Sequence, residues 1–187
     1  MSQEDWQALA GIAQQAPAAL LNWLAEPGLL TARVREYFGE EMRFRMLGPL
    51  RPAPLAEAIQ TRLAVHDDSC LLREIEFCRG AVRIIFAQTI LPASTVNSFP
   101  WLRDLGEAPL GEALRSSDEL LTRDPLEYRA LDRTHGLARA ARATGAGAGS
   151  ALADGLLWAR RAVYRLAGRP ILVQEVFLPE LLQRKST

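Results

Sequence analysis

Lysine, cysteine and histidine are scarce in this chain of 187 residues. Lys185 is the single lysine among 22 basic residues, and there are two cysteines and two histidines. Cys70 and Cys78 are too few for a cysteine-ligated metal centre or a disulfide framework, so we expect free thiols. No segment approaches the roughly 20 apolar residues that cross a membrane. The formal net charge is zero, which argues against a nucleic-acid-binding protein, because such proteins carry excess positive charge.

The length and composition are typical of one globular domain. Apolar residues make up 49% of the chain and charged residues 24%, which is enough to form a core and excludes wholesale disorder. The segment Met1–Trp6 lacks a basic start followed by an apolar run, which predicts that there is no signal peptide. We therefore expect a single domain over residues 1–187 in the cytoplasm, without a membrane span.

Apolar periodicity and turn residues predict an α+β fold built on an antiparallel sheet with helices packed on it. Two strand pairs are the strongest signals, because each pair of β-rich runs flanks a short turn at Arg79-Gly80 or at Gly168-Arg169-Pro170. The expected strands are 42–47, 71–78, 81–91, 158–166 and 171–178. The expected helices are 4–26, 29–38, 109–115 and 125–142, and the expected loops are the proline-rich 48–57 and the flexible 145–150.

Strand alternation places two charged residues on apolar faces. Arg73 shares a face with Leu71, Ile75 and Phe77, and Glu175 shares a face with residues 171, 173 and 177. A buried ion without a partner is strongly unfavourable. Two interpretations are open. Either the two residues pair with each other or with a neighbour such as Glu74, or they form the polar ends of a pocket, where Arg73 binds a ligand carboxylate and Glu175 meets a hydroxyl or a moving proton.

The same residues belong to a series of motifs that resembles the chorismate lyase family, bacterial enzymes that make 4-hydroxybenzoate for ubiquinone. No single motif is specific, but their order along residues 23–179 matches that of the family. The motifs are WL at 23–24, LLTAR at 29–33, LREI at 72–75, TILPAST at 89–95, LGEAPLG at 105–111, TRD at 122–124, LWARR at 157–161 and GRPILVQEVFLP at 168–179.

The resemblance implies a lyase that eliminates pyruvate from chorismate, acting as a monomer without cofactor or metal, with its ligand buried under flaps. It implies that Arg73 binds the ring carboxylate and that Glu175 meets the ring hydroxyl. Backbone amides at Leu30 and Leu110 would complete the substrate and product site. The alternative is a non-catalytic protein of the same fold that binds or senses hydroxybenzoates, although the chain offers no helix-turn-helix for binding DNA.

Two features depart from the family pattern. The family usually has arginine where this chain has Gln88, so we expect Gln88 to contact the substrate as a weaker, uncharged substitute. The segment 125–157 is longer than the family's connection, and we expect a flexible insert around 129–154 that decorates the surface. Next to this insert, Arg160 and Arg161 are expected to place one side chain on each face of their strand.

Overall fold

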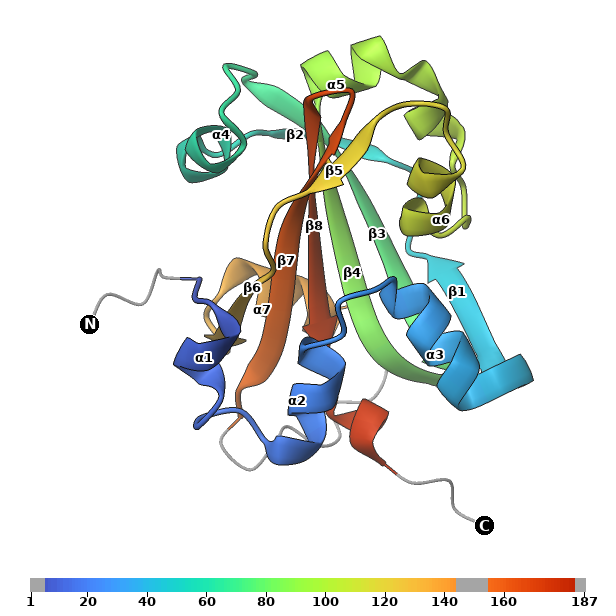
Figure 1. Cartoon of the computed structure of the whole chain (residues 1–187), viewed down its shortest axis with the longest axis vertical. Coiled ribbons are helices and arrows are strands. Elements are labelled where there is room, and N and C mark those ends of the chain that lie inside the picture. The colour runs from blue at the N-terminus through green and yellow to red at the C-terminus, as the bar shows by residue number, and fades with distance from the viewer. Residues whose placement is uncertain (1–5, 144–154, 184–187) are drawn as a thin grey trace.

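An antiparallel sheet of eight strands is the frame of the molecule in the computed structural model, which describes residues 6–143 and 155–183 (Figure 1). The strands are β1 Met42–Met46, β2 Arg51–Pro54, β3 Ser69–Arg79, β4 Val82–Pro92, β5 Leu121–Arg123, β6 Glu127–Leu131, β7 Leu157–Leu166 and β8 Arg169–Phe177. Their order across the sheet is β1-β3-β4-β8-β7-β5, while β2 also pairs with β3 and β6 also pairs with β7. The predicted α+β fold is confirmed.

The two predicted hairpins are confirmed, and they form the centre of the sheet through the pairing of β4 with β8. Gly80, in the turn between β3 and β4, has a φ of 57°. Between β7 and β8, Ala167 and Gly168 have φ of 45° and 81°. Positive φ at both turn residues fits the right-handed twist of the strands. This turn therefore begins one residue earlier than predicted, and residues 169–170 belong to β8.

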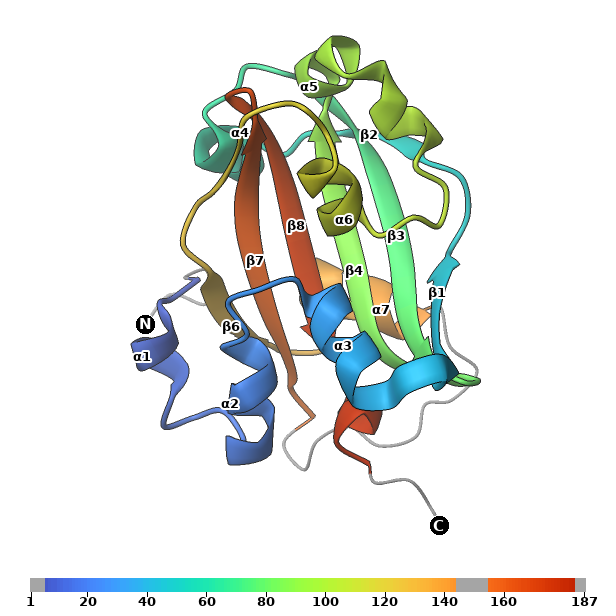
Figure 2. The same cartoon turned by 45° about the vertical axis from the view of Figure 1, so that its right-hand side comes forward.

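Short helices cover both faces of the sheet (Figures 1 and 2). They are α1 Leu9–Ile12, α2 Ala18–Leu24, α3 Leu30–Phe38, α4 Glu57–Leu63, α5 Ala93–Ser98, α6 Leu110–Arg115 and α7 Gly136–Ala143, with 3-10 turns η1 Gly39–Glu41, η2 Pro100–Asp104 and η3 Pro179–Leu182. We call the face under α2, α3 and α6, which carries Arg73 and Glu175, the front face. The rear face, which carries Glu74 and Gln88, lies under α4 and α7.

Each face carries two apolar clusters. On the front face, α2 and α3 pack at one end of the sheet against residues such as Phe77 and Phe177, and α5, η2 and α6 pack at the other end against Leu91. On the rear face, α7 covers Phe86 and its neighbours, and α4 covers the region around Leu172. Burial of these clusters stabilises the fold, and a strip of polar side chains lies between the clusters on each face.

Three predicted elements need correction. The helix expected over 4–26 is divided by Pro17, which caps α2, so α1 and α2 are separate; residues 1–5 lie outside the described part. The loop expected over 48–57 contains β2, since its backbone pairs with the free side of β3 beyond β1. The helix expected over 125–142 begins instead as β6, because pairing with β7 buries Tyr128 and Leu131. For both β2 and β6, backbone pairing with the open edge of a neighbouring strand overrides the local sequence pattern.

The long segment before β7 is part of the core where the structure describes it. Its helix α7 is amphipathic and packs Leu137, Ala138 and Ala141 against the rear face. The expectation of surface decoration is therefore wrong for residues 136–143, because these side chains complete an apolar cluster. The predicted flexible loop over 145–150 lies outside the described residues. In the described ranges, no helix is both long and apolar enough to span a membrane.

Candidate functional site

A cavity lies on the front face, between the two apolar clusters. It has about 480 Å³ of empty space, including the part that opens to solvent. Its floor is formed by β3, β4, β8 and β7, and its walls by the first residues of α3 and α6. Figure 2 shows these two helices in front of the central strands, one toward each end of the sheet. Four of the predicted site residues line it, namely Leu30, Arg73, Leu110 and Glu175.

Arg73 is a buried cation that the protein leaves partly unsatisfied. Its side chain is 1% exposed. Its Nη2 donates to the carbonyl oxygens of Gly106, at 2.8 Å, and Ala108, at 2.6 Å, in the segment that leads into α6. Its buried Nε has no acceptor in the described part of the chain. Burial lowers the pKa of the guanidinium, although arginine stays charged in proteins. The cavity therefore offers a positive charge with a free donor.

Two helix N-termini reach the same cavity. Leu30 is the first residue of α3 and Leu110 is the first residue of α6. The first backbone N–H groups of a helix have no acceptor within the helix, and they carry partial positive charge. Leu29 and Pro109, at the capping positions, provide no side-chain hydrogen bond to these groups. Together with Arg73, the two termini make this part of the cavity suited to an anion.

The two wall segments touch each other. The side chain of Leu29 packs directly against Gly111, where an added Cβ would clash with Cδ2 of Leu29. A salt bridge between Arg35 and Glu112 also joins the two helices, at the exposed outer surface. These contacts close the cavity over the strands, which favours the flap arrangement that the resemblance implies.

Glu175 is paired with an arginine other than Arg73. Its Oε2 accepts from Nε of Arg160 at 2.5 Å, across the hairpin from β7 to β8. Arg160 is 2% exposed, and its Nη1 also donates to the carbonyl oxygens of Leu24, at 3.3 Å, and Glu26, at 2.7 Å. Arg73 and Glu175 therefore do not pair with each other or with Glu74, although Glu175 does have a charged neighbour as its partner, as the first interpretation allowed. Arg160 fixes the carboxylate of Glu175 at the edge of the cavity.

Gln88 does not reach the cavity. It lies opposite Glu74 on the rear face, and its Nε2 donates to Oε1 of Glu74 at 2.7 Å. Its Oε1 accepts from Nε2 of Gln174 at 3.1 Å. The prediction that Gln88 contacts the substrate is therefore wrong, because strand alternation directs it away from its neighbour Thr89, which lines the cavity.

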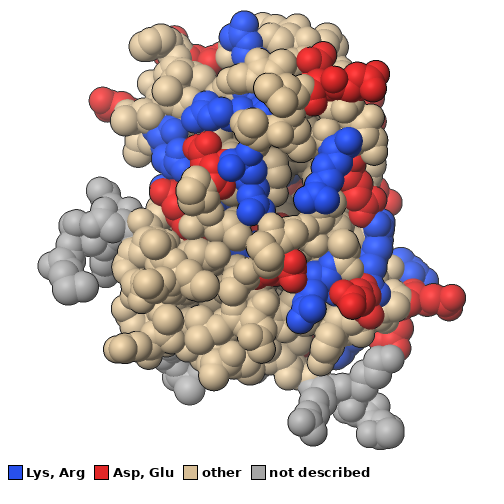
Figure 3. Space-filling model, viewed as in Figure 1, with Lys and Arg blue, Asp and Glu red and all other residues tan. Residues whose placement is uncertain are grey.

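Both faces of the sheet are covered, and the surface over the front carries charges of both signs. Figure 3 shows Arg side chains interspersed with Asp and Glu. In the ranges that the structure describes, no group of three His, Cys, Asp or Glu side chains could hold a metal ion. The polar side chains that line the cavity are those of Arg73, Glu175, Thr31, Thr89 and Tyr164.

Comparison with known proteins identifies the family. The family model described as chorismate lyase matches residues 1–187, the whole chain. This chain belongs to the chorismate lyase family. Members of the family align with most of this chain at moderate sequence identity. The "Probable chorismate pyruvate-lyase" of Thiobacillus denitrificans is 35% identical over 171 residues, covering 90% of this chain and 87% of the relative. The "Chorismate pyruvate-lyase" of Erwinia tasmaniensis is 34% identical over 163 residues, covering 87% and 79%.

Solved structures extend the likeness of this chorismate lyase family member to a wider fold. The effector domain of PhnF from Mycobacterium smegmatis matches with a TM-score of 0.54 at 18% identity, covering 80% of this chain and 88% of that domain. A transcriptional regulator of the GntR family from Bacillus cereus matches with a TM-score of 0.56 at 12% identity, covering 79% of this chain and 99% of that one. At these identities the likeness concerns the fold alone.

Sequence reasoning missed two side chains of this chorismate lyase site. Arg160 was expected only to lie on one face of its strand, opposite to Arg161, and the pairing confirms that arrangement. Its partnership with Glu175 follows from the two-residue turn of the second hairpin, which sets Arg160 opposite Glu175; the sequence left that register open. Tyr164, four residues further along β7 toward the turn, lines the cavity and carried no motif of its own.

Proposed function

We propose that this protein is a chorismate lyase that converts chorismate into 4-hydroxybenzoate and pyruvate in the cavity of the front face. The observation that carries the proposal is Arg73, a fully buried cation with a free Nε beside two uncapped helix N-termini. An unsatisfied buried donor costs about 1–3 kcal/mol, and more for a charged group. A ligand carboxylate would remove that cost, and both chorismate and 4-hydroxybenzoate carry a ring carboxylate.

Arg73 holds the ring carboxylate in this account, with the backbone amides at the start of α3 and α6 around it. Charge-assisted hydrogen bonds of this kind are about twice as strong as neutral ones. Apolar side chains such as Ile75, Val173 and Leu114 surround the rest of the cavity and suit the ring. Because the product keeps the same carboxylate, we expect 4-hydroxybenzoate to bind tightly and to inhibit.

Glu175 accepts a hydrogen bond from the hydroxyl group at ring carbon 4. Arg160 holds this carboxylate in place, so Glu175 cannot turn to meet Arg73 and the two ends of the cavity stay distinct. The fixed carboxylate polarises the adjacent C–H bond, whose hydrogen must leave for the ring to become aromatic. Arg160 acts through Glu175 and is a positioning residue.

The reaction breaks the bond between ring carbon 3 and the ether oxygen, together with the C–H bond at carbon 4. The released electron pair makes the ring aromatic, the ether oxygen becomes the keto oxygen of pyruvate, and a proton reaches the methylene carbon of the leaving group. Atoms and electrons balance without an oxidant or reductant. The protein contributes a fixed ring orientation, exclusion of water and stabilisation of moving charge.

The direct test is incubation of the purified protein with chorismate, with pyruvate measured by a coupled assay and 4-hydroxybenzoate by chromatography. We expect one pyruvate for each 4-hydroxybenzoate, and product formation that slows as 4-hydroxybenzoate accumulates. Tight binding of 4-hydroxybenzoate without release of pyruvate would overturn the lyase proposal and favour a binding protein of the same fold.

We also propose that the chain acts as one domain and as a cytoplasmic monomer that needs no nucleic acid partner, metal or cofactor. The sheet that joins strands from residue 42 to residue 177 supports the single domain, and the balanced charge supports the absence of a nucleic acid partner. Light scattering after size-exclusion chromatography tests the monomer, and turnover in the presence of a chelator tests the metal.

A further inference from the structure

The enolpyruvyl group of chorismate carries a second carboxylate, and one residue of the cavity is placed to bind it. It rests on the proposed lyase function. The enolpyruvyl ether is attached to ring carbon 3, next to the carbon that bears the hydroxyl group. With the ring carboxylate at Arg73 and the hydroxyl at Glu175, the ether leaves the ring to one side of the line that joins these two residues, and the second carboxylate lies on that side. Gln88, which was expected to contact the substrate, lies on the rear face.

The strand pairing shows what stands on the β7 side of the cavity floor. Arg73 on β3 lies opposite Thr89 on β4, which lies opposite Val173 on β8. Tyr164 is on β7, the strand beyond β8, and lines the cavity. Three strand spacings, roughly 14 Å, separate the backbones of β3 and β7. Tyr164 and Arg73 therefore approach the cavity from opposite sides.

Tyr164 and Arg160 flank a small residue on the same face of β7. Ala162 lies between them and opposite Val173, and its side chain is a single methyl group. Ala87 in turn lies opposite Glu175 on β4. Tyr164 therefore lies four residues along β7 from Arg160, the partner of Glu175, and the single methyl group of Ala162 leaves room between them for a substituent of the ring.

The hydroxyl of Tyr164 is prepared to donate. Arg123 is the cross-strand neighbour of Tyr164 on β5, so its positive charge lies close to the phenol. The phenol hydroxyl has one hydrogen to donate. Burial and the charge of Glu175 raise the pKa of Tyr164, so the phenol keeps that hydrogen at neutral pH. Arg123 is exposed and adds positive charge behind the phenol.

The other side-chain hydroxyls that line the cavity lie elsewhere. Thr89 is directly opposite Arg73, and Thr31 is in the first turn of α3. Both are therefore near the proposed position of the ring carboxylate. Among the described residues that line the cavity, Tyr164 is the side-chain donor on the β7 side of Glu175.

We propose that Tyr164, supported by Arg123, donates a hydrogen bond to the enolpyruvyl carboxylate and so selects the dianionic substrate over the monoanionic product. This contact exists only while the ether is intact. It therefore favours binding of chorismate without strengthening the retention of 4-hydroxybenzoate, whose single carboxylate stays at Arg73.

Two stable ligands test this selectivity without relying on turnover. One is 4-hydroxybenzoate, and the other is 3-(carboxymethoxy)-4-hydroxybenzoate, an aromatic dianion with a carboxylate on an ether at carbon 3. For Tyr164→Phe we expect binding of the dianion to weaken roughly ten- to a hundredfold, the loss of one charge-assisted hydrogen bond. Binding of 4-hydroxybenzoate should stay within about twofold of the wild-type value. Arg123→Gln should weaken binding of the dianion alone, by a smaller factor.

Tyr128→Phe is the matched control, because Tyr128 is a buried tyrosine on the adjacent strand β6 that does not line the cavity. It should leave the affinities for both ligands unchanged. Equal weakening of both ligands by Tyr164→Phe, or no weakening of either, would overturn the assignment. If the wild-type protein releases no pyruvate from chorismate, the lyase proposal fails, whereas the ratio of the two affinities still decides the role of Tyr164.

Discussion

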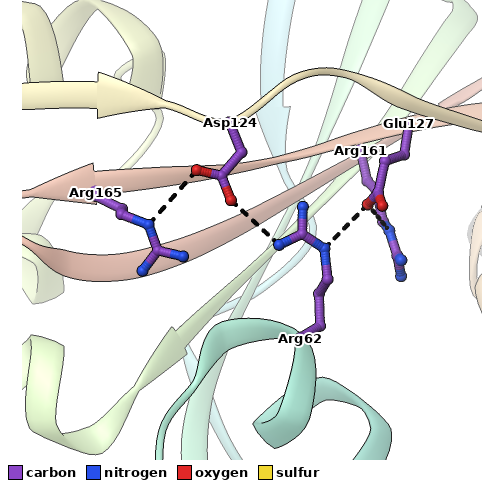
Figure 4. A network of polar contacts seen from close by, with 5 residues as sticks. All are labelled: Arg62, Asp124, Glu127, Arg161 and Arg165. Atoms are coloured by element: carbon purple, nitrogen blue, oxygen red, sulfur yellow. Dashed lines mark hydrogen bonds and ion pairs between the residues drawn. The ribbon is translucent and has the colours of Figure 1, made fainter. Parts of the chain in front are cut away.

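The two faces of the sheet have the same plan, since each carries polar side chains between two apolar clusters. On the rear face these side chains satisfy one another. Gln174 donates to Gln88, which donates to Glu74, and Arg51 pairs with Glu74 from the other side. The row continues at the edge of the sheet as an ion-pair network (Figure 4), which consists of Arg62, Asp124, Glu127, Arg161 and Arg165.

The front face differs because its polar side chains keep unused hydrogen-bonding capacity. Arg73 has a free Nε and carbonyl partners in place of a carboxylate. Arg160 has a carboxylate, but that carboxylate lines a cavity. Burial of charge alone therefore does not distinguish a structural network from a binding site. What distinguishes them is whether the partners are complete without a ligand.

Glu175→Gln should give the largest effect on the front face. The amide keeps the size of the side chain but loses the charge that Arg160 and the substrate hydroxyl use. We expect kcat for chorismate to fall roughly a hundred- to ten-thousandfold, as for loss of a group that handles a proton. Steady-state pyruvate release measures this. A kcat within threefold of the wild-type value would show that Glu175 has no part in the reaction.

Gln174→Leu breaks the rear row and should affect stability instead. The side chain is 7% exposed, and its removal leaves Oε1 of Gln88 without its donor. We expect a loss of about 1–3 kcal/mol in the free energy of unfolding. Urea denaturation measures the loss, and titration with 4-hydroxybenzoate should give an unchanged affinity. A variant with wild-type stability but weakened binding would reverse the assignment of the two faces.

Glu112→Gln tests the link between the two walls of the cavity. Glu112 forms a salt bridge with Arg35, and the exposed fractions of the two side chains are 38% and 46%. The salt bridge therefore contributes at most about 1 kcal/mol to holding the walls together. We expect 4-hydroxybenzoate to dissociate up to roughly fivefold faster, because the walls separate more easily. Stopped-flow release measures the rate. High salt should likewise speed dissociation from the wild-type protein. It should leave the dissociation rate of the variant unchanged.

Protonation of His135 should weaken the packing of α7 on the rear face. The stability of the protein should therefore depend on pH, and this effect should be the smallest of those predicted here. Its Nδ1 accepts from the backbone N–H of Leu137 at the start of α7. Burial, with the charge of Arg129, lowers the pKa of this histidine below its ordinary value of 6.5. As the pH falls, His135 in the unfolded chain therefore takes up a proton before His135 in the folded protein. The contribution of His135 to the free energy of unfolding is complete above pH 6.5 and decreases as the pH falls through that value.

Urea midpoints at pH 7.5 and 5.5 measure this dependence. The midpoint of wild type should decrease more between the two pH values than that of His135→Asn. The same decrease in both proteins would exclude His135 as the cause.

The sequence predicted those parts of the fold and the site that depend on local signals. Turn residues and strand-like runs predicted both hairpins, and alternation put Arg73 and Glu175 on the apolar faces of their own strands. The partners of these residues were not predictable from the same signals. Arg160 depends on the register of a turn, and the carbonyls of Gly106 and Ala108 belong to a distant loop. β6 was missed because its partner strand, β7, lies 26 residues further along the chain.

For Gln88, the family resemblance and the geometry of the strand predict different positions. Its neighbour Thr89 lines the cavity, and adjacent residues on a strand point to opposite faces. Since Arg73 pairs with Thr89, the hairpin register alone sends Gln88 to the rear. A departure from the family pattern at this position therefore concerns the rear row and leaves the cavity unchanged.

The most direct test of the difference between the two faces is calorimetric titration of 4-hydroxybenzoate into Arg73→Gln and Gln88→Ala, variants of residues one position apart in register on adjacent strands. We predict that Arg73→Gln binds at least roughly ten- to a hundredfold more weakly than wild type, and that Gln88→Ala binds as wild type does. Unchanged binding in Arg73→Gln, or equal loss in both variants, would contradict the account.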